Sequence, residues 1–367
     1  MRVTVVIHSL TGGGAERIAA ELAGICAERG CSTSLVSMDR PRSGEYALDA
    51  RVTRRDLDVL GTSRGPWDAV RSNRQRIRSL RQALQTLHPD VVVSLTEKTN
   101  VLTLLAAGPL GIPVVVSERV DPRQHRVGSA WSLLRRLTYR RAAALVVQTR
   151  SVAEWARRIA PHVPVTVIPN AVRTPPAWVQ TRRGRGQRNQ QVVGIGRLEP
   201  QKGFDLLLTA FARVIQTCPQ ATLTLVGEGS QRASLEAGVR ELGLAERVRF
   251  SGRLADVWEV LAAADVFVLS SRYEGFPNAL LEAMAAGVAC VAFDCPSGPG
   301  EIIRHGCDGL LVPTGDVDAL AAAVTRLLRD EALRRRLGEA ARAVVDRFDE
   351  RTYADRWMAV LQSVVRG

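Results

Sequence analysis

The stretch that decides the fold is DVFVLSSRYEGFPNALLE at residues 265–282. It opens with a short apolar run, 265–270, which predicts a buried parallel strand. After a loop, Asn278 suits the N-cap of a helix that starts in ALLEAMAAG. Glu274 therefore lies on the loop at the carboxyl end of the strand, and Glu282 lies one helical turn further on. In an open α/β sheet, that edge is where ligands bind.

Strand and helix signals alternate along the whole chain, in two series separated by a Gly/Arg-rich segment. Two such series predict an α/β protein with two doubly wound parallel sheets. The expected parts are a first domain at 1–172, a linker at 173–190, a second domain at 191–346 and a last helix at 347–367. Predicted strands cover 2–8, 33–38, 91–95, 113–117, 144–148 and 165–168, then 191–196, 222–226, 248–251, 265–269, 288–293 and 309–312.

Length and charge narrow the class of protein. At 367 residues the chain is too long for one core and suits two domains. Its net charge of +13 is uneven, because residues 1–190 carry +16 and residues 191–367 carry −3. A nucleic acid, an anionic bilayer or a diphosphate substrate would each account for the basic half. The acidic second half and the missing recognition motif argue against a nucleic acid.

The cysteines and the N-terminus predict a cytoplasmic protein. Six sparse cysteines without a C-x2-C pair indicate reduced thiols. The N-terminus begins with a strand and not with a signal peptide. Residues 99–117 carry no charge, but Gly108-Pro109 and Gly111-Ile112-Pro113 divide them into a helix, a turn and a strand. We therefore expect no transmembrane span there.

Two cations lie in GIGRLEPQKGF at 194–204, which we expect to link a strand to a helix at the carboxyl edge of the second sheet. Arg197 and Lys202 can hold a diphosphate there and neutralise the charge that develops as it leaves, without a metal. Lys202 is one of only two lysines in the chain. The plain alternative is a pair of solvated surface cations.

Two glycine-rich loops also follow predicted strands. Gly12-Gly13-Gly14 precedes a helix from Ala15, and its backbone can approach a phosphate or an acceptor. The second loop, PSGPGEI at 296–302, follows the strand that ends at Asp294. Because tight turns between strand and helix often use glycine anyway, neither loop identifies a site by itself.

The E-x7-E pattern, with Gly-Phe-Pro after the first acid, resembles the donor-sugar motif of retaining glycosyltransferases with the GT-B fold, family 4. The resemblance implies two Rossmann-like domains facing a cleft and a C-terminal helix that crosses back to the first domain. It implies that Glu282 bonds the ribose hydroxyls of a UDP-sugar and that Glu274 contacts the sugar or supports charge at its anomeric carbon. Taken alone, Glu282 would be a charge near a helix N-terminus and Glu274 a loop acid. The implied donor-binding residues are Gly13, Gly14, Arg197, Lys202, Glu274, Gly275, Phe276, Asn278, Ala279, Glu282, Ser297 and Gly298.

Ser117-Glu118-Arg119 stands where many family members have a histidine. Together with FPNALLEAMAAG and FDCPSGPGEII, this triplet resembles the branch that adds hexoses or N-acetylhexosamines to polyprenyl-diphosphate-linked glycans. On this resemblance Glu118 joins Arg197, Lys202 and Glu274 among the catalytic residues. Arg119 and His125 are expected on the acceptor side.

The residues that could be metal ligands show no ligand spacing, so we expect neither a metal nor another cofactor. We interpret the two D-x-D pairs as surface acids. The residues concerned are Asp56 and Asp58, Asp316 and Asp318, and the histidines His8, His88, His162 and His305.

A long helix is predicted over residues 67–87, with an apolar stripe beside a basic one. A solvated helix face is the ordinary explanation of a charged stripe, but such faces usually mix both signs. A purely basic stripe suits an anionic membrane surface and a lipid-linked diphosphate. The stripe consists of Arg71, Arg74, Arg78 and Arg81.

The sequence thus predicts a metal-independent, retaining glycosyltransferase. It would move a hexose or N-acetylhexosamine from a UDP-sugar to a glycan acceptor linked to polyprenyl diphosphate. We expect it in the cytoplasm, peripheral on the inner face of the cell membrane. Two alternatives stay open: a soluble transferase for a small metabolite, and a nucleotide-sugar epimerase of the same fold.

Overall fold

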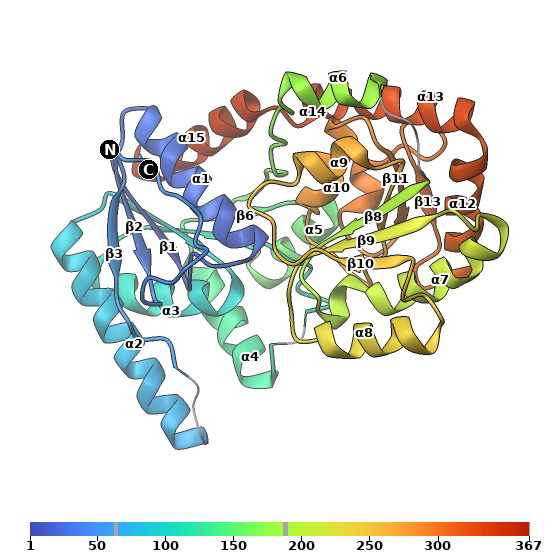
Figure 1. The fold of residues 1–367 in the computed structure, drawn as a ribbon. Helices are drawn as coiled ribbons and strands as arrows, with labels where there is room; N and C mark the ends of the chain where they lie inside the picture. Colours follow the sequence, from blue (N-terminus) through green and yellow to red (C-terminus); the bar gives the residue numbers. More distant parts are fainter. Residues whose placement is uncertain (62–64, 126, 186–189, 367) are drawn as a thin grey trace. The chain divides into compact units, whose positions relative to one another are not determined.

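A computed structural model describes residues 1–61, 65–125, 127–185 and 190–366. The chain divides into two compact units (Figure 1). Unit 1 comprises residues 1–170 together with 351–367, and unit 2 comprises residues 171–350. Each unit is built on a single parallel sheet with helices on both faces.

Within the described residues, unit 1 holds a seven-stranded parallel sheet in the order β3-β2-β1-β4-β5-β6-β7. All six strands predicted for this half are present. The sequence analysis missed β3, because its Thr-Arg-Arg-Asp sequence has no buried residue and no apolar alternation at the sheet edge. The strands are β1 (Arg2–Ile7), β2 (Ser32–Ser37), β3 (Thr53–Asp56), β4 (Val91–Leu95), β5 (Val114–Ser117), β6 (Ala144–Val147) and β7 (Val165–Val167).

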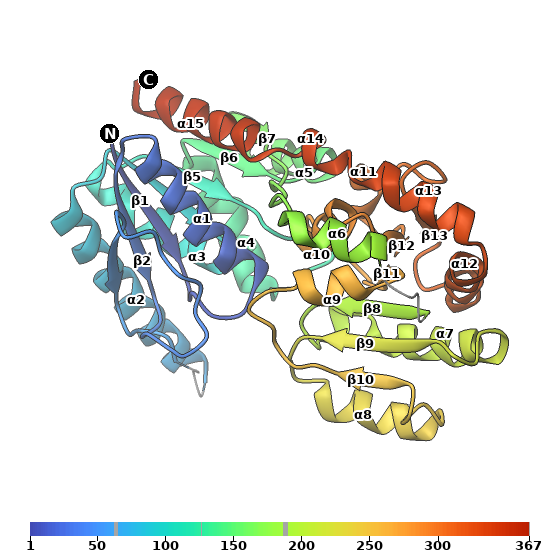
Figure 2. The ribbon, with the colours of Figure 1, turned by 45° about the horizontal axis from the view of Figure 1, so that its top comes forward.

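The helices of unit 1 include the expected long helix and the expected C-terminal helix. The last helix belongs to unit 1, because Trp357 is fully buried there and Asp355 pairs with Arg29 at the end of α1 at 2.8 Å. Figure 2 shows this helix running back beside α1. The helices are α1 (Gly14–Glu28), α2 (Pro66–Leu87), α3 (Glu97–Ala107), η1 (Gly108–Leu110), α4 (Ser129–Thr138), η2 (Tyr139–Arg141), α5 (Arg150–Ile159) and α15 (Glu350–Arg366).

The uncharged segment 99–117 is divided as predicted, into the rest of α3, the short η1 turn and β5. None of the helices in the described ranges has the length and apolar character needed to cross a bilayer.

The described part of unit 2 holds a six-stranded parallel sheet in the order β10-β9-β8-β11-β12-β13, and every predicted strand is present. The strands are β8 (Gln191–Ile195), β9 (Thr222–Val226), β10 (Val248–Phe250), β11 (Val266–Leu269), β12 (Ala289–Phe293) and β13 (Leu310–Val312). The helices are α6 (Ala177–Arg185), η3 (Pro200–Lys202), α7 (Phe204–Thr217), α8 (Arg232–Glu241), α9 (Trp258–Ala263), α10 (Asn278–Ala285), α11 (Pro299–Ile302), α12 (Val317–Arg329), α13 (Glu331–Ala341) and α14 (Val344–Arg347).

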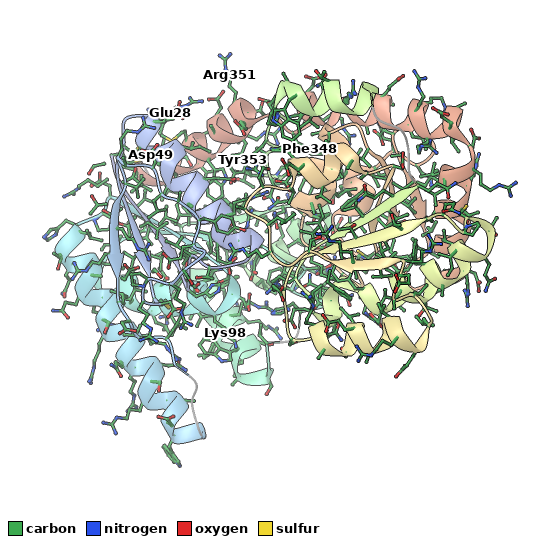
Figure 3. The ribbon with its side chains drawn as sticks, viewed as in Figure 1. Glu28, Asp49, Lys98, Phe348, Arg351 and Tyr353 are labelled. Atoms are coloured by element: carbon green, nitrogen blue, oxygen red, sulfur yellow. The ribbon has the colours of Figure 1, made fainter. Side chains whose placement is uncertain are left out.

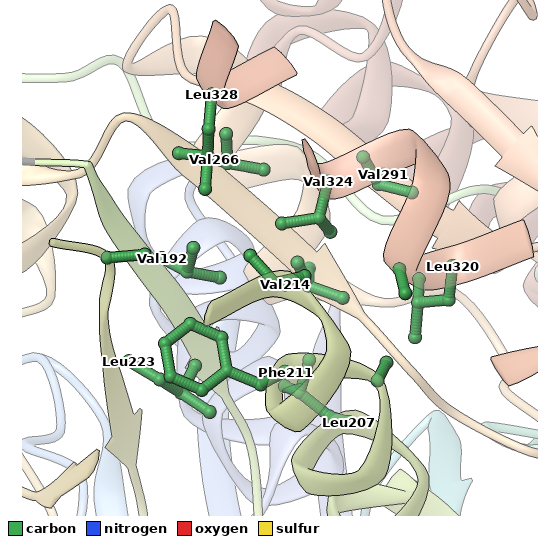
Figure 4. Packing of buried hydrophobic residues seen from close by; sticks show 14 of the residues in the cluster. Val192, Leu207, Phe211, Val214, Leu223, Val266, Val291, Leu320, Val324 and Leu328 are labelled. Atoms are coloured by element: carbon green, nitrogen blue, oxygen red, sulfur yellow. The ribbon is translucent and has the colours of Figure 1, made fainter. Parts of the chain in front are cut away.

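The apolar residues of the central strands fill both faces of the unit 2 sheet. On one face α7 and α12 cover the strands, with Phe211, Val214 and Val324 packed over Val266 and Val291 (Figure 4). Each of these side chains is at most 1% exposed, and a fully buried side chain of this kind contributes roughly 1.5–3 kcal/mol. This packing holds the carboxyl ends of the strands in place.

Two local details differ from the expectation. Within the predicted linker 173–190, α6 occupies Ala177–Arg185, a helix that the sequence did not predict, and Val179 is fully buried in the core of unit 2. The helix α10 begins at Asn278 itself, with Pro277 at the N-cap position, because proline fixes the backbone just ahead of the first turn.

Both units share one topology. Counted along each unit, the strands lie in the order 3-2-1-4-5-6, with a seventh strand added in unit 1. The order reverses between β1 and β4 in unit 1 and between β8 and β11 in unit 2. Ligands of doubly wound sheets bind at the carboxyl ends of the strands beside such a switch point.

Candidate active site

The switch point of unit 2 carries a buried ion pair between the two loops that meet there. Lys202, from the loop after β8, donates from Nζ to Oε1 of Glu274, from the loop after β11, at 2.6 Å. Ser271 donates to the same carboxylate oxygen at 2.6 Å. The Glu274 side chain is 5% exposed and the Lys202 side chain 17%. The sequence therefore predicted correctly that these two residues lie at one edge, although they are 72 positions apart.

Backbone and side-chain contacts fix these loops against each other. Gly203 has a φ of +61°, and a Cβ there would lie 2.1 Å from the carbonyl oxygen of Ser270. Only glycine fits this close approach. Arg272 adds a bidentate pair with Asp205, at 2.8 and 2.6 Å, and a bond to the carbonyl of Pro200. The loops are thus rigidly joined where a ligand would bind.

Arg197 is the second cation of this edge. Its side chain is exposed, and among the described residues it makes no hydrogen bond or ion pair. The neighbouring acid, Glu199, is engaged with the backbone and hydroxyl of Ser230 at 2.9 and 2.7 Å. Arg197 is therefore available to an anion arriving from solvent.

A third loop at this edge approaches Glu274. Gly298 has a φ of +92°, and a Cβ there would lie 2.9 Å from the carbonyl oxygen of Gly275. Ser297 also has a positive φ of 72°, which is uncommon for a residue with a side chain. Such strain often marks ligand-binding loops. The structure thus brings Ser297, Gly298, Gly275, Glu274 and Lys202 together.

Glu282 lies on α10 and is 4% exposed. Its Oε1 accepts a hydrogen bond from Arg173 at 2.9 Å. The guanidinium of Arg173 lies over the ring of Trp258, 5.6 Å from its centre. A charge-assisted bond and a cation–π contact together orient the Glu282 carboxylate. The sequence analysis missed Arg173, since 109 positions separate it from Glu282 and no motif marks it.

Three residues near the pair need separate description. The side chain of Phe276 is 5% exposed and packs edge-on against Phe348 in the core of unit 2, and its predicted contact with the donor stays a prediction. Asn278 and Ala279 are half-buried at the start of α10. Cys295, which the sequence analysis did not single out, is buried beside the pair, and burial followed by the Glu274 charge raises the pKa of its thiol to about 12.

The glycine loop of unit 1 lies at the carboxyl end of β1, beside the other switch point. A Cβ on Gly13 would lie 2.1 Å from Oε2 of Glu16, so this carboxylate lies against the loop. Glu16 also pairs with Nε2 of His8 at 3.1 Å. An anion bound to Gly13 and Gly14 would therefore lie beside a carboxylate, which makes this loop a poorer phosphate site than predicted.

Glu118 follows β5 and is 1% exposed, which corrects its prediction as a catalytic residue in contact with substrate. Tyr139 donates to its Oε1 at 2.5 Å, and Arg135 lies 3.8 Å away. Oε2 has no hydrogen-bond partner in the described part of the chain. Burial raises the pKa of Glu118 to about 7, against the opposing charge of Arg135. Glu118 thus supports the structure from inside the unit.

His125 and Glu97 form the accessible acid–base pair of unit 1. Nε2 of His125 lies 3.4 Å from Oε1 of Glu97, and the His125 side chain is 38% exposed. Burial raises the pKa of Glu97, but the bonds from His125 and from the backbone outweigh it, so the pKa is lowered overall. The exposed part of His125 is thus open to a substrate at the edge of the unit 1 sheet.

Arg119 is half-buried in unit 1, and its predicted place on the acceptor side stays a prediction. It donates to Oδ1 of Asn170, and burial lowers its pKa although Tyr353 and Glu21 oppose that change. Asn170 is the last residue of unit 1 before the chain leaves it, and Tyr353, on α15 (Figure 3), follows its return. Arg119 is therefore bonded to the residue at which the chain leaves unit 1.

The basic stripe on α2 is shorter than predicted. Arg71, Arg74 and Arg78 are exposed. Arg81 instead donates to the carbonyl oxygens of Leu105 and Ala106 at the end of α3, at 3.1 and 3.3 Å. A cation at that position stabilises the C-terminal end of a helix, so Arg81 is structural.

Three of the four D-x-D acids are engaged by other residues of the chain, and the fourth, Asp58, is exposed. Asp56 pairs with Arg54 at 2.8 Å, Asp316 caps α12 by accepting from Ala319 at 2.9 Å, and Asp318 pairs with Arg213. Over the described residues, no group of three His, Cys, Asp or Glu side chains is placed to hold a metal ion.

Comparison with known proteins identifies the family. The family model described as "Glycosyl transferases group 1" matches residues 181–344, and "Glycosyl transferase 4-like domain" matches residues 13–171. The lipopolysaccharide core biosynthesis glycosyltransferase LpsD of Rhizobium meliloti is 30% identical over 96% of both chains. The chain belongs to the glycosyltransferase family that these two models describe, group 1 with a 4-like first domain. The GT-B glycosyltransferase of family 4 expected from the sequence is thereby confirmed.

Two further relatives differ in how much of them is matched. An α-1,4-N-acetyl-D-galactosaminyltransferase of Campylobacter jejuni, named for a PP-undecaprenol-linked acceptor, is 27% identical over 99% of both chains. The exopolysaccharide phosphotransferase SCO2592 of Streptomyces coelicolor is 34% identical over 78% of this chain, which spans only 30% of that protein.

Solved structures support the fold. Sucrose-phosphate synthase from Thermosynechococcus elongatus superposes with a TM-score of 0.83 over 99% of this chain and 98% of that one, at 21% identity. The Anabaena protein Alr3699/HepE, in complex with UDP-glucose, gives 0.79 over 99% and 100% of the two chains, at 23% identity. The glycosyltransferase described here thus has the two-sheet fold of these enzymes.

Proposed function

We propose that this glycosyltransferase moves a hexose or N-acetylhexosamine from a UDP-sugar to a polyprenyl-diphosphate-linked glycan, with retention of configuration and without a metal. The observation that carries the proposal is the Lys202–Glu274 pair beside the exposed Arg197, at the switch point of unit 2. One relative is named for a PP-undecaprenol-linked acceptor, and a protein with the same fold is known in complex with UDP-glucose; both support the proposal.

The pair offers a simple way to receive a diphosphate. In the absence of donor, Glu274 balances the charge of Lys202 in a nearly dry site. A donor diphosphate would take over Lys202, together with Arg197 from solvent, and leave the Glu274 carboxylate facing the sugar. Two cations at the leaving group stabilise the negative charge that grows as the sugar–phosphate bond breaks. The same two cations supply the role that a metal ion plays in other transferases.

The proposed ribose contact rests on Glu282. Arg173 occupies one carboxylate oxygen, and its contact with Trp258 keeps that carboxylate in one orientation. A carboxylate held in this way is preorganised to accept hydrogen bonds from two neighbouring hydroxyls, such as those of a ribose. Arg173 would then act as a positioning residue of the donor site.

On the acceptor side, His125 with Glu97 is the proposed contact with the glycan, and the exposed Arg71, Arg74 and Arg78 are the proposed contact with a lipid diphosphate or anionic headgroups. We propose that the enzyme works in the cytoplasm, on the inner face of the membrane. A soluble small-metabolite transferase would need no such basic helix.

The test is a melting-temperature panel followed by a transfer assay. A ligand that binds only the folded state raises the melting temperature, so UDP should stabilise the protein more than GDP, ADP or TDP. The stabilising UDP-sugar is then incubated with polyprenyl-diphosphate glycans in EDTA, and the anomeric configuration of the product is read by NMR. Transfer of an inverted sugar, or release of an epimerised sugar without transfer, would overturn the proposal.

A further inference from the structure

The helix α4 turns its apolar stripe toward solvent. Leu133, Leu134 and Leu137 are 58%, 38% and 55% exposed, and Ala130 on the same stripe is also exposed. The spacing i, i+3, i+4, i+7 puts these four residues on one side of the helix. A stripe of this kind normally faces the core. Here it forms an apolar ridge on the surface of unit 1, which we call the α4 ridge.

The opposite side of α4 is firmly held, so the ridge is not a helix packed the wrong way round. Arg135 is buried, lies 3.8 Å from Glu118 and stacks over the ring of Trp155 at 4.9 Å. The ammonium of Lys98 lies over the ring of Trp131, 5.9 Å from its centre, in a cation–π contact. Figure 3 labels Lys98 near α4. These contacts fix the rotation of α4 and leave the leucines outside.

Arginines surround the ridge without any acid between them. Arg136, Arg140 and Arg141 are exposed, and residues 129–149 contain no Asp or Glu. An apolar ridge flanked by cations is the pattern of helices that lie in the interface of an anionic bilayer.

The start of α2 also exposes apolar side chains beside arginines, with one acid, Asp68, among them. Trp67 is 87% exposed and Val70 44%, beside the exposed Arg71 and Arg74. The helix α3 packs against both α2 and α4, so the three helices form one layer of unit 1. In Figure 1, α4 and the start of α2 both reach the lower edge of unit 1. Exposed tryptophan is common where proteins meet the membrane interface.

We propose that the α4 ridge enters the apolar layer of an anionic membrane, with Trp67 and Val70 of α2 as its second contact and the flanking arginines on lipid headgroups. This inference rests on the proposed function, because it explains how unit 1 reaches an acceptor whose lipid stays in the bilayer. The charges that flank the ridge are all positive, which matches the anionic headgroups of such a membrane.

The experiment is co-sedimentation of the full chain with vesicles of phosphatidylglycerol and phosphatidylcholine, or of phosphatidylcholine alone. The wild type should bind the anionic vesicles, more weakly at high salt. Leu133→Ser/Leu134→Ser/Leu137→Ser should lower the partition coefficient by ~10²-fold, because three apolar side chains no longer leave water. The matched control is Leu242→Ser/Leu254→Ser, which changes exposed leucines of unit 2 and should bind as the wild type does.

Further measurements separate this inference from the proposed function. The triple variant should keep the melting-temperature rise given by UDP, and also its transfer to a water-soluble, short-chain prenyl-diphosphate glycan. If transfer to the soluble acceptor falls equally, the ridge serves the enzyme directly, and the inference is wrong. A wild type that stays in the supernatant, or that forms a dimer through the ridge in sedimentation analysis, also overturns it. Loss of the UDP response in the wild type would instead refute the proposed function.

Discussion

The switch points of the two units share one strand order and differ in their chemistry. In unit 2, Lys202 and Glu274 meet at 2.6 Å beside the exposed Arg197, on loops that contact each other. In unit 1, the same position holds two histidine–carboxylate pairs, His8 with Glu16 at 3.1 Å and His125 with Glu97 at 3.4 Å. Strand order decides where a site forms, whereas loop residues decide what binds there.

The difference between the two switch points matches the roles that we propose for the two units of a transferase. Cations suit the departure of a diphosphate, and a histidine paired with an acid suits the recognition of sugar hydroxyls. The basic excess of the first half of the chain does not lie at its switch point but on its helices. The membrane contact proposed above accordingly lies on two of these helices, α2 and α4.

The largest expected effect breaks the unit 2 site. Lys202→Ala should lower kcat by ~10²–10³-fold, because one electrostatic donor to a developing charge is typically worth that much. Arg197→Ala should act in the same direction. The matched control is Arg213→Ala, which removes a surface cation of unit 2 paired with Asp318 and should leave kcat unchanged. Steady-state kinetics with purified proteins decide the matter, and near-normal kcat in both site variants would refute the diphosphate assignment.

A second prediction concerns the buried acid of unit 1. Folding raises the pKa of Glu118 from 4.5 to about 7. The unfolded chain therefore releases this proton first, and the stability of the fold falls as pH rises from 4.5 to 7, by roughly 3 kcal/mol. Glu118→Gln should remove that loss, so that the variant is more stable than the wild type at pH 8.

Urea unfolding at pH 5 and pH 8 measures this effect. Glu97→Gln is the matched control, since the lowered pKa of Glu97 makes its charge stabilising at neutral pH and the variant should lose stability there. Equal pH profiles for the wild type and Glu118→Gln would contradict the raised pKa.

A smaller effect sharpens the role of Glu282. Arg173→Ala should weaken UDP binding ~10-fold with kcat little changed, because it loosens the carboxylate that we propose to hold a remote part of the donor. It should also reduce the preference for UDP over 2′-deoxy-UDP, whereas Arg173→Lys restores part of it. Calorimetric titration gives both affinities. An unchanged preference would mean that the Arg173–Glu282 pair only supports the fold.

The smallest expected effect is that of a chelator, which should leave turnover unchanged. Turnover should be the same in EDTA as in buffer with added magnesium, because on the proposed function Lys202 and Arg197 neutralise the diphosphate. A rate that disappears in chelator and returns with magnesium or manganese would show that the cations of unit 2 are not sufficient.

The sequence sufficed for what depends on strand ends. Lys202 and Glu274 each follow a predicted strand, and parallel strands bring their carboxyl ends to one edge, so their meeting could be expected across 72 residues. Contacts that depend on side-chain packing could not be predicted from the sequence. Nothing local marks Arg173 as the partner of Glu282, or Arg81 as a cap of α3.

The sequence also did not show which side of a helix faces the core, or how deeply a side chain is buried. The apolar stripe of α4 is visible in the sequence, but periodicity does not say which side faces the core. The buried contacts of Arg135 decide that question. The burial of Glu118 could not be predicted for a similar reason, because its place in a motif does not reveal that Tyr139 donates to its carboxylate.

The return of α15 to unit 1 has a consequence for the order of synthesis. Residues 1–170 leave the ribosome long before residues 351–367, yet Trp357 and Leu361 are fully buried in the same unit. The nascent unit 1 therefore waits with an uncovered apolar surface while all of unit 2 is made, and unit 2 is free to fold first. A truncation or fusion near the C-terminus thus acts on the half of the enzyme that was translated at the start.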